Sequence, residues 1–194
     1  MRELTEELLL KAGKLPPSEV VVIVLERLNL GKYGGVLAPK AEILACSHNV
    51  FQTLHGVFDQ FPSVWWLDMS FNKLTSGFKP PCPYSLGLLD IRGNGMTLEA
   101  LKSLSNTLIL RLRVDVDSSE HLPVSRKRGF TRGCVLRLLQ VWVLNDDFVT
   151  SEELAEASKL RDMNEESDTS GTITDGEWFC SRVPNEREKD MMGV

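Results

Sequence analysis

Three asparagines, Asn49, Asn72 and Asn94, constrain the fold of this chain more than any other feature. They lie 23 and then 22 residues apart. Each asparagine closes a segment in which apolar residues recur at steps of three, two and five. A pattern that returns at this interval predicts a solenoid, in which each copy forms one turn and buries its apolar side against the next.

The apolar positions are the same in all three copies: Ala41, Leu44, Cys46 and Phe51; Val64, Leu67, Met69 and Leu74; and Leu86, Leu89, Ile91 and Met96. The step of two is typical of a short strand, whose side chains alternate between two faces. In the central copy, Leu67 and Met69 are therefore predicted to point into the core. Trp66 and Asp68 then point outward. The asparagine side chain is expected to cap backbone groups that the turn leaves unpaired.

Two degenerate copies flank the three clear ones. We assign Leu25, Leu28 and Leu30 to the first, with Tyr33 in the asparagine position. We assign Thr107, Leu110 and Leu112 to the fifth, with Asp115 in that position. The chain is predicted to finish the ladder on one more strand over 141–145. The returns over 50–60 and 97–105 are expected to form helical turns, whereas the prolines within 77–85 favour an extended backbone.

Both ends of the array carry helix signals. Thr5 is a candidate N-cap for an amphipathic helix over 4–12, and Thr150 with Glu153 forms a capping box that opens a helix ending near Met163. We therefore assign 1–163 to one repeat domain with a cap at each end. Residues 164–194 are rich in acidic and small polar residues, which predicts a disordered acidic tail.

The charge and the cysteine content narrow the range of possible functions and cellular locations. The net charge is −5, and residues 151–194 hold 12 of the 27 acidic side chains but only 5 of the 22 basic ones. The repeat domain is thus near neutral, which disfavours nucleic-acid binding. Four separated cysteines and a charged amino terminus favour a reducing, cytoplasmic location, with a nuclear or ciliary one also compatible. No apolar run is long enough to span a membrane.

No motif indicates catalysis or a metal site. The sequence contains no nucleophile elbow, zinc-protease helix or Walker-type phosphate loop. Cys46 and His48 are close in sequence, but Cys46 is predicted to point into the core from the strand, and His48 to point outward from the turn. The glycine-rich stretch 31–35 has the wrong spacing for a phosphate loop and favours a turn. We expect no enzyme activity, cofactor, metal or small-molecule substrate.

These residues together resemble the intracellular leucine-rich-repeat proteins that have short repeats of about 22 residues and a carboxy-terminal cap. The resemblance rests on the helical lead-in at 4–11, on the repeat residues named above, and on 129–132 with the apolar residues that follow. It implies an α/β solenoid with short parallel strands on its concave face and helical or irregular convex returns. The family includes phosphatase regulators, axonemal proteins, splicing factors and tubulin-folding cofactors, and its shared task is to hold partner proteins on the concave face.

The concave face is therefore the predicted site, and a protein is the predicted partner. Its candidate residues are Arg27, Asn29, Lys32, His48, Trp66, Asp68, Phe71, Asp90, Arg92, Arg111 and Arg113. The alternative is that the tail helix covers some of the outward apolar residues, Ile43 and Leu88 above all. The preferred hypothesis is a non-enzymatic adaptor, for instance in a cytoskeletal or ciliary assembly. The alternative is a regulatory subunit of an enzyme such as a phosphatase or a GTPase.

Two short motifs leave alternatives open. Residues 125–128 contain three basic side chains after a serine and are compatible with a nuclear import signal or a kinase target, although three basic residues are a small cluster and a solvated cap loop is the favoured explanation. Trp178 and Phe179 form an apolar pair in the acidic tail, which suggests a docking motif or a pair without function.

Overall fold

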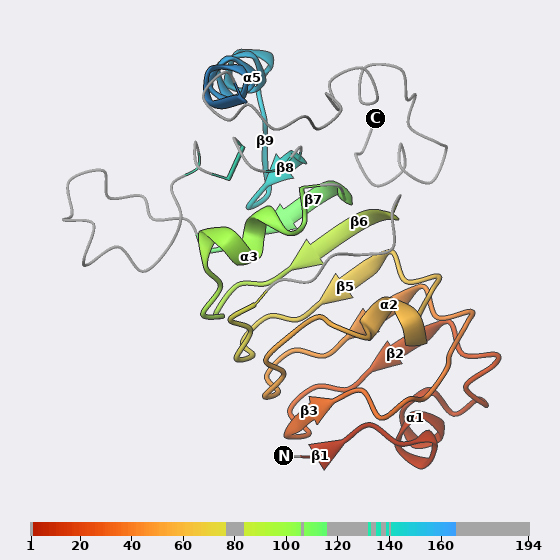
Figure 1. The fold of residues 1–194 in the computed structure, drawn as a ribbon. Helices are drawn as coiled ribbons and strands as arrows, with labels where there is room; N and C mark the ends of the chain where they lie inside the picture. The colour runs from red at the N-terminus through yellow and green to blue at the C-terminus, as the bar shows by residue number, and fades with distance from the viewer. Residues whose placement is uncertain are drawn as a thin grey trace.

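The chain coils into a solenoid, in which parallel strands stack side by side in one sheet and long return segments join them (Figure 1). The computed structural model describes residues 2–76, 84–105, 107–115, 132, 135–136, 139 and 141–165. Within them, seven strands form one sheet in the order β2-β4-β5-β6-β7-β8-β9. These strands are β2 (Val22–Val24), β4 (Ile43–Ala45), β5 (Trp66–Asp68), β6 (Tyr84–Asp90), β7 (Thr107–Arg113), β8 (Val141–Leu144) and β9 (Asp147–Phe148).

The register of the sheet confirms the predicted solenoid. Neighbouring strands from β2 to β8 are parallel, and β9 alone among the described strands of this sheet is antiparallel to its neighbour. From β2 to β7 the chain makes four turns. The residues in register at the centre of each turn lie 21, 23, 22 and 23 positions apart: Ile23, Leu44, Leu67, Leu89 and Leu112. The repeat spacing read from the asparagines is therefore the pitch of the coil.

The asparagine ladder lies at the turn that follows each strand. The Oδ1 of Asn72 accepts a hydrogen bond from the backbone N–H of Phe51 in the preceding turn, at 3.1 Å. Its Nδ2 donates to the carbonyl oxygens of Cys46, Met69 and Ser70 at 3.0, 3.0 and 3.2 Å. One buried amide thus joins two turns of the coil, which confirms the predicted capping role and explains why the residue recurs.

The predicted phase of the first repeat is wrong. The strand is β2, and its register with β4 makes Ile23 the equivalent of Leu44. The pattern therefore starts five residues earlier than Leu25, and Leu28, not Tyr33, occupies the asparagine position. The segment is apolar in either phase, so the sequence pattern fits both. Pairing with β4 selects the one that buries Val20, Ile23 and Leu25 together.

The predicted phase of the fifth repeat is also wrong, by two residues. The β6–β7 register places Ile109 opposite Leu86 and Leu112 opposite Leu89. The inward residues are consequently Ile109, Leu112 and Val114, all buried. The asparagine position falls at 117, outside the described residues. The Asp115 carboxylate instead accepts a hydrogen bond from the N–H of Gly93 at 2.7 Å.

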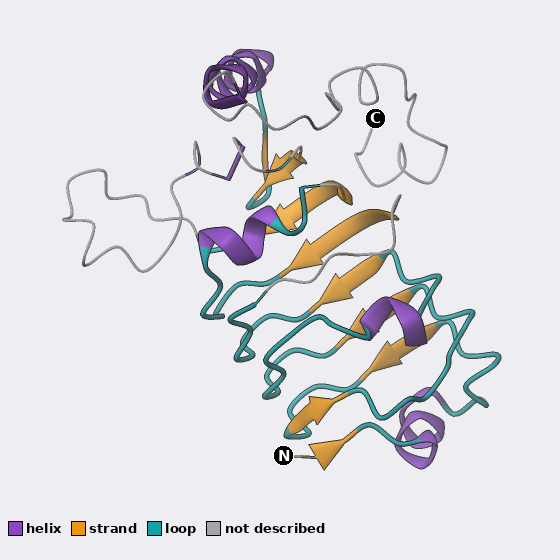
Figure 2. Cartoon of the chain, in the orientation of Figure 1, coloured by secondary structure: helices purple, strands orange, loops and turns teal. Residues whose placement is uncertain are grey.

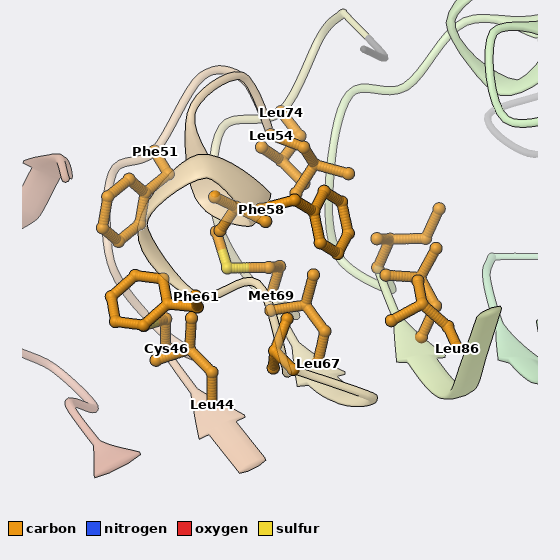
Figure 3. Packing of buried hydrophobic residues seen from close by; sticks show 14 of the residues in the cluster. Leu44, Cys46, Phe51, Leu54, Phe58, Phe61, Leu67, Met69, Leu74 and Leu86 are labelled. Carbon is orange, nitrogen blue, oxygen red and sulfur yellow. The ribbon is translucent and has the colours of Figure 1, made fainter. Parts of the chain in front are cut away.

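The returns fill the other side of the coil (Figure 2). As predicted, 50–60 and 97–105 contain short helices, α2 (Val57–Gln60) and α3 (Leu98–Lys102). Figure 3 shows how the core forms between strands and returns. Strand-side residues pack against aromatic rings from the return before the next strand: Leu44, Cys46, Leu67 and Met69 against Phe51, Phe58 and Phe61. The predicted extended return at 77–85 lies outside the described residues up to 83.

The amino-terminal end is closed by α1 (Glu6–Gly13). Its N-cap is Thr5, as predicted, and the Thr5 hydroxyl accepts a hydrogen bond from the N–H of Leu8 at 3.3 Å. Leu8 and Leu9 are buried in the core, whereas Ala12 on the same helix is exposed. A second sheet, absent from the sequence prediction, pairs β1 (Arg2–Glu3) with β3 (Leu30–Lys32).

The carboxy-terminal end combines a predicted strand with an unpredicted hairpin. β8 continues the parallel ladder over residues predicted as its last strand, and β9 then folds back on it. Asn145 and Asp146 connect them with φ values of 53° and 70°, as a tight hairpin turn requires. The capping box is confirmed, because Thr150 N–H donates to Glu153 and Glu153 N–H donates to Thr150. It opens α5 (Ser151–Glu165). The predicted tail from 166 onward lies outside the described residues.

Arg132 closes this end. Its guanidinium Nε donates to Glu153 Oε1 at 2.6 Å, and its Nη2 donates to the carbonyl oxygen of Phe148 at 3.1 Å. The hydrogen bond from Arg132 lowers the pKa of Glu153 to about 2. The pair therefore fastens the start of α5 to the β8–β9 hairpin.

Candidate functional site: the ladder face

The candidate site is the face of the seven-stranded sheet that points away from the core, here termed the ladder face. Two rows of outward side chains run across it, in register from strand to strand. The first row is Val22, Ile43, Trp66, Leu88, Arg111 and Val143. The second row is Val24, Ala45, Asp68, Asp90 and Arg113.

The ladder face is open at one end and closed at the other. Val22 and Val24 on β2 are 48% and 52% exposed. Ile43 and Trp66 are partly exposed. Leu88 on β6 is only 1% exposed, whereas Ile43 on β4 remains accessible. The accessible apolar surface is therefore concentrated over β2, β4 and β5.

A network of charges occupies the closed end. The Asp90 carboxylate is buried and accepts hydrogen bonds from Arg92, with Nη2 to Oδ2 at 2.6 Å and Nε to Oδ1 at 3.1 Å. Arg113 lies 3.7 Å from the same carboxylate and pairs with Asp146 at 2.8 Å. The hydrogen bond to Asp90 raises the pKa of Arg92. The network brings together three predicted site residues and holds them to one another.

Two aspartates also organise the ends of their own strands. Asp68 Oδ1 accepts a hydrogen bond from the N–H of Ser70 at 2.9 Å, and Asp90 Oδ1 accepts one from the N–H of Arg92 at 3.2 Å. Each carboxylate thus satisfies a backbone donor two residues on, which is a common role of aspartate at turns.

A third row, the left-handed row, borders the ladder face just beyond the strands. It consists of the equivalent residues of four turns, whose φ values are 56°, 56°, 54° and 67°: Arg27, His48, Phe71 and Gly93. The N–H groups of Arg27, His48 and Phe71 each donate to a carbonyl oxygen of the next turn, at 3.2, 3.0 and 2.7 Å. These bonds hold bulky residues in a conformation that they rarely adopt.

Two aromatic side chains of the left-handed row stack on each other. The rings of His48 and Phe71 have centroids 4.6 Å apart and planes 10° apart. Phe71 also covers Gly93, since a Cβ added there would lie 2.4 Å from Phe71 Cδ1. Phe71 remains 51% exposed. The stack is therefore a rigid aromatic ledge beside the open part of the ladder face.

The corrected phases move several predicted residues. Arg27 lies in the left-handed row rather than on a strand. Asn29 follows in the turn, and Lys32 lies on β3, in the two-stranded sheet. Arg113, predicted just past a strand end, lies within β7 opposite Asp90. Sequence reasoning missed Val22 and Val24, although the match of Val20 and Ile23 to Ala41 and Leu44 would have found them.

The described part of the chain offers little for other chemistry. No group of three or more His, Cys, Asp or Glu side chains within it is placed to hold a metal ion. Cys46 is buried and His48 is exposed, as predicted, because His48 lies in the turn beyond β4. Burial raises the pKa of the Cys46 thiol. Among the described helices, none has the length and apolar character needed to cross a bilayer.

No protein-family model matches the sequence of this chain, and no curated protein matches it.

Proposed function

We propose that this chain is a leucine-rich-repeat protein of the short-repeat class, and that it acts as a non-enzymatic adaptor that binds a partner protein on the ladder face. The asparagine ladder and the 21- to 23-residue pitch support the class. The observation that carries the function is the open apolar surface over β2, β4 and β5, bordered by the aromatic ledge.

This surface has the composition of a binding site. Trp66 on β5 supplies a large, partly exposed apolar side chain, and Phe71 at the border of the surface supplies a second. Aromatic and arginine side chains dominate the binding energy of most protein interfaces. The Asp90–Arg92–Arg113 network adds charge at one side, where it contributes selectivity and orientation more than affinity.

The test is capture of partners from cell extract by the immobilised full chain. Trp66→Ala combined with Phe71→Ala removes both aromatic anchors. Leu37→Ala is the control, because Leu37 is a large apolar side chain that is 56% exposed and lies between β3 and β4, off the strands of the ladder face. Arg92→Ala is less suitable, since it removes a hydrogen-bond donor of the buried Asp90 carboxylate.

We expect mass spectrometry to find a defined set of proteins that the control retains and the double variant loses. Far-UV circular dichroism should show that both variants remain folded. Identical sets from all three chains would contradict the ladder face as the site.

A further inference from the structure

Asn94 differs from the other two ladder asparagines in the residue that follows it. Asn49 and Asn72 precede residues that carry a side chain, whereas Asn94 precedes Gly95. No other asparagine of the chain is followed by glycine. The side-chain amide of an asparagine can be attacked by the backbone nitrogen of the next residue. Glycine favours this reaction, because it has no Cβ to obstruct the approach and the greatest backbone freedom.

The backbone nitrogen that would attack is held by a hydrogen bond in the earlier turns but not at Gly95. After the first ladder asparagine, the N–H of Val50 donates to the carbonyl oxygen of Leu30 at 2.8 Å. After the second, the N–H of Lys73 donates to the carbonyl oxygen of Phe51 at 2.9 Å. The equivalent N–H of Gly95 has no acceptor in the part of the chain that the structure describes, and Gly95 is exposed. Its nitrogen is therefore free to react.

The amide that would be attacked is activated by the ladder itself. Asn94 Oδ1 accepts a hydrogen bond from the N–H of Leu74 at 2.9 Å. A donor at this distance stabilises the negative charge that develops on Oδ1 when a nucleophile adds to Cγ. Asn49 and Asn72 have backbone donors on Oδ1 as well, but these two side chains are buried, whereas Asn94 is partly exposed. Only Asn94 combines an activated amide with a free nitrogen among the three ladder asparagines.

We propose that Asn94 is a site of spontaneous deamidation in the folded chain. The Gly95 nitrogen gives its proton to a base from the solvent and adds to Asn94 Cγ. The new N–Cγ bond closes a succinimide ring, the Cγ–Nδ2 bond breaks, and Nδ2 takes a proton from water and leaves as ammonia. Water then opens the ring. Hydrolysis of the N–Cγ bond gives aspartate, and hydrolysis of the backbone C–N bond gives isoaspartate. In sum, one water is consumed and one ammonia released, without an oxidant, a reductant or an enzyme.

Both products weaken the ladder. Asn94 Nδ2 donates to the carbonyl oxygens of Met69, Ile91 and Arg92 at 3.0, 2.9 and 3.2 Å. A carboxylate can still accept from Leu74, but it cannot donate to these three oxygens and repels them. The Ile91 carbonyl accepts no other hydrogen bond in the described part of the chain, so it loses its partner. Isoaspartate in addition lengthens the main chain of the turn by one methylene. Deamidation is thus an irreversible loss of stability at the turn after β6.

The test is incubation of the folded full chain at mildly alkaline pH, with samples analysed over time by peptide mapping and mass spectrometry. We expect conversion of the peptide that contains Asn94, release of an equal amount of ammonia, and unchanged peptides for Asn49 and Asn72. Gly95→Ala should leave Asn94 intact over the same period. A Cβ at Gly95 would lie 3.5 Å from its nearest neighbours, an ordinary contact, so this variant keeps the fold. Asn94→Asp should lower the midpoint of urea unfolding, as incubation lowers that of the wild type.

The unfolded chain in urea gives the comparison that decides the outcome. If Asn94 is converted there but stays intact in the folded chain, the ladder protects the residue and the proposal is overturned. Equal conversion of Asn49 or Asn72 in the folded chain overturns it as well, and this comparison needs no variant. Conversion of Gly95→Ala at the rate of the wild type overturns the role of the free glycine nitrogen. Since no partner protein is present, failure here is independent of the adaptor function.

Discussion

The ladder asparagines differ in the number of backbone groups that depend on each of them for a hydrogen bond, and this difference yields a quantitative prediction of the stability lost on substitution. Asn72→Ala leaves the buried N–H of Phe51 without its acceptor. The three carbonyl oxygens that Asn72 binds each keep another donor: Asn49 for Cys46, Asn94 for Met69, and the N–H of His48 for Ser70. One orphaned buried donor costs about 1–3 kcal/mol. We expect a loss of that size.

Asn49→Ala should cost roughly twice as much. Its Oδ1 accepts from two N–H groups, those of Leu28 and Leu30, both at 3.0 Å. Its Nδ2 also donates to the carbonyl of Leu25 at 2.6 Å. The first turn has leucine at its own asparagine position, so the Leu25 carbonyl has no second ladder amide to replace that bond. Two orphaned donors predict a loss of about 2–6 kcal/mol.

Equilibrium unfolding in urea, followed by far-UV circular dichroism, measures both losses. Gln52→Ala is the control, because the Gln52 side chain is exposed. The backbone carbonyl of Gln52 accepts a hydrogen bond from the N–H of Thr75, and the substitution keeps this bond. An exposed substitution of this kind should stay within about 0.5 kcal/mol of the wild type. If Asn72→Ala loses as much stability as Asn49→Ala, the reasoning from shared carbonyls is refuted.

Three further predictions concern single residues. Hydrogen bonding to Arg132 holds the pKa of Glu153 at about 2, below its ordinary value of 4.5. This contribution to stability is present above pH 4.5 and lost as the pH falls through about 2, so Glu153→Gln should flatten the acid limb of the thermal stability profile. Gly93→Ala and Gly35→Ala both place alanine at a φ near 70° and should each cost about 1–2 kcal/mol, but only Gly93→Ala displaces Phe71 and should weaken partner capture. Cys46 should resist alkylation until the chain unfolds, which peptide mapping by mass spectrometry detects; labelling of the native protein would contradict its burial.

The sequence predicted most of the fold because its repeats carry redundant information. Three copies with the same apolar spacing and the same asparagine determine the pitch, the inward residues and the solenoid class together. The caps were predictable at Thr5 and at Thr150 with Glu153 because helix N-termini require side-chain acceptors at defined positions. The candidate site was predictable in outline, since outward residues follow once the inward ones are known.

The predicted phases of the two degenerate copies were wrong for a physical reason. Where the asparagine is missing, apolar spacing alone fits two phases, and the difference lies in which residues the neighbouring strand buries. Pairing with β4 selected Val20, Ile23 and Leu25 in the first turn, and pairing with β6 selected Ile109 and Leu112 in the fifth. The five-residue error in the first copy is the reason that Val22 and Val24 were not predicted as outward residues.

By itself, then, the sequence determined the repeating unit of this protein: its length, its apolar positions and the amide that caps each turn. Those features depend on local periodicity and on hydrogen bonding at short range along the coil. Only the tertiary structure decided the phase at the ends of the array, the stacking of His48 on Phe71 and the pairing of Asp90 with Arg92 and Arg113. It also decided that β2 is the terminal strand of the seven-stranded sheet, because strand neighbours are set by contacts between turns.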